Sequence, residues 1–170
     1  MLSWLLGMEI NILIDEDLAA YINEGWLQKV ASQALSALGA DPTTELGLVI
    51  TDQEKIQKLN SEYLGRNEPT DVLAFSMLPE PLPAEGGKPD LHPFIEPPDG
   101  VSHLGEVIIS YPQAVIQAQE QQHSVEREIA ILVIHGILHL MGYRDDTPEF
   151  ASQMKAKETE ILSRMEEKGS

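Results

Sequence analysis

His135 and His139 are the residues whose type and spacing point most directly to chemistry. They follow the apolar run Ile129 to Ile134, and residues four positions apart on a helix share one face. Two neutral imidazoles arranged in this way can direct ring nitrogens at one cation, as the H-E-x-x-H helices of metalloenzymes do. The residue after the first histidine is Gly136, where a peptidase of that type carries its general-base glutamate. The pattern therefore predicts metal ligands without the usual peptide-cleaving base.

A third ligand is expected shortly after this helix, because a catalytic zinc takes three ligands from the protein. Gly142 can end the helix and let the chain turn back toward the histidines. Asp145 is then the best placed carboxylate, and Asp146 is the second choice. The sequence has no Cys, so a transition-metal site must use His and carboxylate groups. Hydrogen-bonded core histidines are the alternative, but the turn with its carboxylates favours a metal site.

This stretch resembles the YbeY endoribonucleases, also called rRNA maturation factors. Their hallmark H-G-x-L-H-L-x-G-Y-D-H matches the sequence through Tyr143, and Arg144 and Asp145 then stand where the family has Asp and a third His. Segments 59–75 and 104–110 resemble the second and third motifs of the family. The resemblance implies cleavage of single-stranded RNA, in the maturation of small-subunit ribosomal RNA and in ribosome quality control.

Arg66 and Glu106 are the expected catalytic side chains. The family has an Arg directly after the Tyr of its second motif, but that position is Leu64 here and Arg66 lies two residues on. Its guanidinium could hold a phosphate through two hydrogen bonds, and a solvated loop arginine is the alternative. Glu106 stands where the third motif has an acidic residue. It would orient or deprotonate the nucleophile, unless it is a solvent-side strand carboxylate.

The expected cofactor is one zinc ion held by His135, His139 and Asp145. Three protein ligands leave a position for water, whose pKa the metal would lower toward neutrality. An Asp in place of a third His brings more negative charge to the site. Manganese or another divalent metal is therefore the alternative cofactor.

Composition limits the classes of partner. The chain has 170 residues and a hydrophobic fraction of 42%, as is ordinary for a soluble globular protein, and we expect it in the cytoplasm without a membrane partner. Its net charge of -17 is unusual for a nucleic-acid-binding protein, because displaced counterions supply much of the affinity of such proteins. The expected partners are single-stranded RNA, ribosomal RNA or the small ribosomal subunit, together with ribosome-associated proteins.

Hydrophobic periodicity predicts the order β-α-α-β-α-β-β-α-α-α, in which 17–39 is helical in two pieces divided near Gly25. This order gives an α+β fold with a small mixed sheet packed on five or six helices, and the resemblance implies four strands and a central metal-bearing helix. We expect one YbeY-like metallohydrolase domain over 8–170, with a Pro-rich insertion at about 78–101 and an N-terminal extension over 1–7.

Two other functions are consistent with these residues. A non-catalytic ribosome-assembly factor would keep the metal for structure, and the departures at Leu64 and Asp145 and the acidity favour it. A metallopeptidase-like hydrolase would share the two-His helix but would need Glu106 as its base, because Gly136 replaces the usual one.

Overall fold

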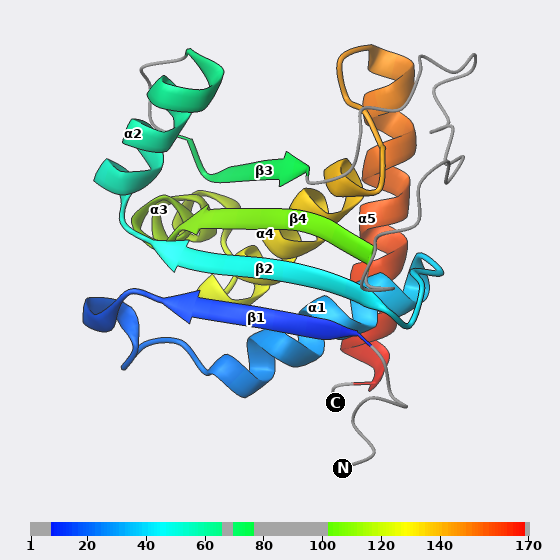
Figure 1. The fold of residues 1–170 in the computed structure, drawn as a ribbon, viewed down its shortest axis with the longest axis horizontal. Coiled ribbons are helices and arrows are strands. Elements are labelled where there is room, and N and C mark those ends of the chain that lie inside the picture. The colour runs from blue at the N-terminus through cyan, green and yellow to red at the C-terminus, as the bar shows by residue number, and fades with distance from the viewer. Residues whose placement is uncertain (1–7, 66–69, 77–101, 169–170) are drawn as a thin grey trace.

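The computed structural model describes residues 8–65, 70–76 and 102–168. Within these ranges four strands form one mixed sheet in the order β1-β2-β4-β3 (Figure 1). β1 pairs in parallel with β2, and β2 in parallel with β4, whereas β3 runs antiparallel to β4 at the edge. The strands are β1 Glu9–Ile14, β2 Thr44–Thr51, β3 Val72–Ser76 and β4 Ser102–Ser110. The predicted four-stranded mixed sheet is confirmed.

Five α-helices accompany this sheet in the described part of the chain, and α5 packs on α4 and α1, which confirms the α+β class. They are α1 Glu24–Ala37, α2 Gln53–Leu64, α3 Tyr111–Gln121, α4 Val125–Leu140 and α5 Pro148–Lys168, with a short 3-10 turn, η2 Glu16–Leu18, before α1. The Asn23 side chain caps α1 by accepting a hydrogen bond from the backbone N–H of Trp26 at 2.9 Å. The break predicted near Gly25 therefore lies before Asn23, and Gly25 is inside the first turn of α1.

α4 is the central helix of the fold. It contacts α1, α3 and α5 as well as β3 and β4. The Ser124 side chain caps its start by accepting a hydrogen bond from the backbone N–H of Arg127 at 3.1 Å. Ile134, Ile137 and Leu138 are fully buried on it. Burial on nearly all sides explains why the sequence of this helix is a continuous apolar run rather than an amphipathic stripe.

Gly136 lets α4 lie directly against β4. A Cβ atom at this position would come within 2.5 Å of Cγ1 and 2.9 Å of Cγ2 of the fully buried Val107. The absence of a side chain thus brings the helix backbone close to the sheet. A glutamate at position 136 would meet the sheet at this point, which explains why the position cannot carry the base of an H-E-x-x-H peptidase.

α2 covers part of the other face of the sheet. Ile56 of α2 packs with Leu73 of β3 and Ile108 of β4 in a second, smaller apolar cluster. The main core lies on the α4 face and includes Leu48 and Val107 from the central strands. Because successive side chains of a strand point to opposite faces, this division also decides where each polar strand residue lies.

The predicted N-terminal extension 1–7 and the predicted insertion at about 78–101 both lie outside the described residues. The boundaries of the domain therefore stay a prediction. Among the helices that the structure describes, none combines the length and apolar character needed to span a membrane.

Candidate metal site

His135 and His139 lie together on one face of α4, as their spacing predicts. Their Nε2 atoms are 3.2 Å apart, and their ring centroids are 4.7 Å apart with the ring planes at 80°. Both side chains are about one-third exposed, at 30% and 32%. The two rings therefore direct nitrogens at one point that solvent can reach.

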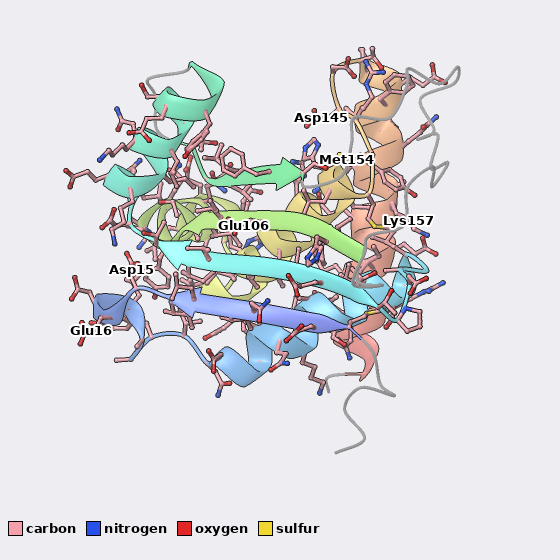
Figure 2. All side chains as sticks on the ribbon, viewed as in Figure 1. Asp15, Glu16, Glu106, Asp145, Met154 and Lys157 are labelled. Atoms are coloured by element: carbon pink, nitrogen blue, oxygen red, sulfur yellow. The ribbon has the colours of Figure 1, made fainter. Side chains whose placement is uncertain are left out.

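Asp145 reaches the same point from the turn that follows α4. The chain turns at Gly142, and the Tyr143 backbone N–H donates a hydrogen bond to the Leu138 carbonyl at 2.9 Å. Oδ2 of Asp145 then lies 3.5 Å from Nε2 of His139 and 3.9 Å from Nε2 of His135. Figure 2 places Asp145 beyond the end of β3, beside α5.

Asp146, the other predicted candidate, is held elsewhere. Nε of Arg144 donates a hydrogen bond to Oδ1 of Asp146 at 3.1 Å, and a second nitrogen of the same guanidinium contacts Oδ2. The Arg144 guanidinium also lies over the ring of Phe150, 5.1 Å from its centroid. The structure thus groups Asp145, rather than Asp146, with the two histidines.

Glu158 of α5 lies behind His135, and it is not among the site residues that the sequence pattern predicts. Nδ1 of His135 donates to Oε2 of Glu158 at 3.1 Å, and Nζ of Lys155 donates to Oε1 at 3.1 Å. Glu158 is only 5% exposed. A signal was present, since Glu158 stands four residues after Met154 and three before Ile161, on the buried stripe of an otherwise ordinary amphipathic helix.

The charge state of this pair prepares His135 to bind a cation. Burial opposes ionisation of Glu158, but the hydrogen bonds from His135 and Lys155 lower the pKa of its carboxyl. An ionised Glu158 keeps a proton on Nδ1 of His135, so the lone pair of a neutral ring is on Nε2. A carboxylate behind a ligating histidine is a recurrent feature of protein zinc sites.

The surroundings shift the pKa values of His135 and His139 in opposite directions. Burial opposes protonation of His135, but the hydrogen bond and charge of Glu158, with the charges of Asp145 and Asp71, raise its pKa. Burial, followed by the charge of His135, lowers the pKa of His139, which also hydrogen-bonds to the backbone of Tyr143. The surroundings thus attract positive charge, while the two rings do not readily carry it together.

The geometry of the three residues fits a divalent cation. Each offers one ligand atom, and these atoms lie within 4.8 Å of one another. A tetrahedral zinc about 2.1 Å from each ligand atom would separate those atoms by roughly 3.4 Å. The separations of 3.2, 3.5 and 3.9 Å lie close to that value. Two imidazoles and one carboxylate are also a donor set that zinc accepts at catalytic sites.

Glu106 is not part of this group. Its neighbour Val107 packs against Gly136 of α4, so Glu106 points to the opposite face of the sheet, where its Cγ lies over Gly47. It is exposed there, in a shallow hollow that Asn11 and Leu13 of β1 also line. The structure therefore does not bring Glu106 to the histidines. Of the two readings that the sequence left open, the geometry supports the solvent-side carboxylate (Figure 2).

Arg66, the other predicted catalytic residue, lies outside the described residues. The described range that contains α2 ends at Gly65, the C-cap residue of that helix, and the next described range begins at residue 70. The role of Arg66 as a phosphate clamp stays a prediction.

The chain is similar to named proteins over most of its length. The family model described as Endoribonuclease YbeY matches residues 13–166. The chain belongs to the YbeY family. A Dehalococcoides mccartyi (strain CBDB1) protein named Endoribonuclease YbeY is 46% identical over 160 residues, which cover 94% of this chain and 95% of the relative. A protein of the same name from Roseiflexus sp. (strain RS-1) is 38% identical over 154 residues, or 90% of each chain.

A solved structure shares the fold of this YbeY family member. The solution structure of a Thermotoga maritima protein matches it with a TM-score of 0.55 and 21% sequence identity, over 94% of this chain and 93% of the other. At this level of identity the match supports the fold alone. Asp145 stands at the position of the third His in the YbeY hallmark. In the structure it lies against both His135 and His139, as a third ligand would.

The position of Glu158 predicts a defect in metal binding. Glu158→Gln keeps the size of the side chain but removes its charge, so Nδ1 of His135 loses its ionic partner. We expect about 10- to 100-fold weaker zinc binding, measured by competition with a chromophoric chelator. Glu160→Gln is the matched control, because Glu160 is exposed on the same helix and pairs with Lys157. Equal zinc affinity in the two variants would contradict a role for Glu158 behind the metal.

Proposed function

We propose that this protein is a zinc-dependent endoribonuclease that cleaves single-stranded RNA. The observation that carries the proposal is the convergence of the His135, His139 and Asp145 ligand atoms within 4.8 Å, in a chain of the YbeY family. The names of its relatives support the reaction class, since they are called endoribonucleases at 34–52% identity.

The residues of the chain supply the rigid frame of such a site. His135 is oriented by Glu158 and His139 by the backbone of Tyr143, so neither ring needs to reorganise when a cation binds. Asp145 is 48% exposed and leaves an open approach for substrate on its side of the site. When bound, zinc would polarise a phosphoryl oxygen as a Lewis acid and lower the pKa of water beside it. Manganese or another divalent cation is compatible with the same donor set.

Arg66 completes the proposed site. In the sequence it comes after Gly65, the C-cap residue of α2, and a guanidinium can hold the scissile phosphate with two hydrogen bonds and offset charge that develops during cleavage. Glu106 receives no role here, because it faces away from the ligand atoms.

The proposed biological setting follows from the family resemblance. We propose that the substrate is ribosomal RNA of the small subunit, processed in the cytoplasm during maturation and quality control. The charge of -17 gives little general attraction to RNA. A ribosome-associated protein partner would help to bring such an acidic enzyme to its substrate.

The acidity also favours a second candidate, a non-catalytic assembly factor with a structural metal. Under that function the metal would stabilise the turn after α4, and purified protein would cleave no RNA. A metallopeptidase is less consistent with the structure, because position 136 faces Val107 rather than the ligand atoms.

Metal removal tests the proposed function. We expect purified protein to cleave a labelled single-stranded RNA in preference to the matched duplex, to lose this activity after treatment with a chelator, and to regain it with stoichiometric zinc. Casein should stay intact under the same conditions. Circular dichroism before and after chelation is the control for folding. Zinc-loaded, folded protein that leaves RNA uncut would favour the assembly factor.

A further inference from the structure

The side chains of Tyr63 and Phe75 form an exposed aromatic pair between α2 and β3. Their ring centroids are 5.6 Å apart and their planes meet at 68°, an edge-to-face arrangement. Tyr63 is 68% exposed although it is large and aromatic. An edge-to-face contact supports the ring at its rim or on one side and leaves ring surface open to solvent.

Phe75 anchors this aromatic pair to the apolar core. It is half-buried and packs on the small apolar cluster of Ile56, Leu73 and Ile108. Tyr63 itself stands in the last turn of α2, the helix that carries Ile56. An aromatic side chain has only two rotatable bonds, so holding Tyr63 in place for a ligand costs little conformational entropy.

The pair lies along the strand that leads to the candidate metal site. The backbone carbonyl of Phe75 is next to the place where a Cβ atom of Gly105 would stand, and the Leu140 side chain is 3.0 Å from the same place. Leu140 directly follows His139 in α4. In Figure 1, β3 runs from beside α2 toward α5, and Figure 2 places Asp145 beyond its end.

The two sites are on opposite sides of an edge strand. Phe75 points to the α2 face of the sheet, whereas Val72 and Ala74 of the same strand pack on the core beneath α4. β3 pairs with β4 on one side only, within the part of the chain that the structure describes. A ligand that reaches both sites must therefore bend from one face of the sheet to the other. A single nucleic-acid strand is flexible enough to do this, whereas a duplex is stiff over such a short distance.

We propose that Tyr63, supported by Phe75, is a stacking platform for an unpaired base of the RNA substrate. The proposal rests on the proposed function and adds a binding subsite to it. Stacking of a base on an aromatic side chain contributes about 1–3 kcal/mol and tolerates any base, because every base has an aromatic face. It also depends little on charge. Such a contact suits a protein whose net charge of -17 gives little general attraction to RNA.

Tyr21 provides a matched control for Tyr63. It is equally exposed, at 69%, but its ring stacks on Tyr111 with centroids 6.1 Å apart and planes at 26°. One ring face is therefore covered already. Tyr21 follows β1, and β1 and β3 are at opposite edges of the sheet. Tyr21→Ala should leave RNA cleavage unchanged.

Steady-state cleavage by the zinc-loaded full chain tests the platform. We expect Tyr63→Ala to raise KM for a single-stranded RNA by about 5- to 150-fold with kcat nearly unchanged, because a remote binding contact is lost. Tyr63→Phe should keep the wild-type KM, since its ring can still stack. Tyr63→Leu should behave like Tyr63→Ala, since it keeps apolar volume but has no ring.

An abasic scan of the substrate gives a second, direct readout. Removing one base at a time should identify a position at which the wild-type KM rises, and the same removal should have little further effect in Tyr63→Ala. A wild-type KM in Tyr63→Ala, or an abasic effect that is equally large in both proteins, would overturn the platform while cleavage by the wild type upholds the nuclease. Equal losses in Tyr63→Phe and Tyr63→Ala would overturn stacking and point to the hydroxyl. A folded, zinc-loaded wild type that cleaves no RNA would overturn the proposed function and the platform with it.

Discussion

Replacing His139 with alanine is expected to abolish both metal binding and RNA cleavage. The remaining pair, His135 and Asp145, falls short of the three protein ligands that a catalytic zinc requires. The loss of affinity should exceed the roughly 10- to 100-fold loss expected for Glu158→Gln, which removes only support behind a ligand. Zinc content by elemental mass spectrometry and cleavage of single-stranded RNA measure the two effects.

Substitution of Asp145 and of Asp146, which are adjacent in the sequence, tests which carboxylate binds the metal. Asp145→Ala should lose zinc in the same way, whereas Asp146→Ala should keep it, because Asp146 pairs with Arg144 instead of the histidines. His103→Ala is the control for removal of a histidine, since His103 pairs with Glu45 at 3.0 Å, away from α4. Zinc retained in Asp145→Ala would mean that Asp145 is not a ligand. If His139→Ala lowered stability and the wild type had no cleavage activity to lose, the metal would be structural.

Gly105→Ala is expected to lower the free energy of unfolding by about 2–4 kcal/mol. The φ of Gly105 is +145°, a conformation that L side chains rarely adopt. An added Cβ would also lie against the Phe75 backbone carbonyl and 3.0 Å from Cδ2 of Leu140. Because both obstacles come from packed elements, β3 or the end of α4 would have to move. Urea unfolding of the metal-free protein measures the change.

Gly47→Ala is the matched control on the neighbouring strand. The Cβ added there would meet Cγ of Glu106 at 2.9 Å, and Glu106 is an exposed and flexible side chain that can turn away. Its φ is not in the left-handed region. We expect a change within about 0.5 kcal/mol, as is usual for surface substitutions. Similar unfolding midpoints for the two variants would contradict the close approach at Gly105.

Local spacing along the chain was sufficient to predict the ligand-bearing helix. The i, i+4 separation of His135 and His139 dictates a shared face, and Ser124 and Gly142 mark the start of the helix and the turn after it. The central position of this helix was implied by the family resemblance, and the structure places it in contact with three helices and two strands. The shared face of the two histidines and the ends of the helix depend only on helix geometry over a few turns, so the local sequence pattern is sufficient to predict them.

Tertiary structure decided every feature that depends on contact between distant segments. Glu158 is 23 residues from His135 and reaches it only because α5 packs beside α4. The face on which Glu106 lies follows from the strand alternation only once the helix-packed face is known. Asp145 and Asp146 are adjacent in sequence, and the choice between them depended on how the turn directs each side chain.

The order of the strands shows the same division. Local apolar patterns predicted each strand, but the position of β3 at the edge, and with it the contact between Tyr63 and Phe75, emerged only from pairing of segments far apart in the chain. Sequence by itself thus determined which residues could bind a metal. The fold decided which side chains orient the candidate metal ligands, that Glu106 faces away from them, and where a substrate could bind. Those properties arise from packing rather than from periodicity.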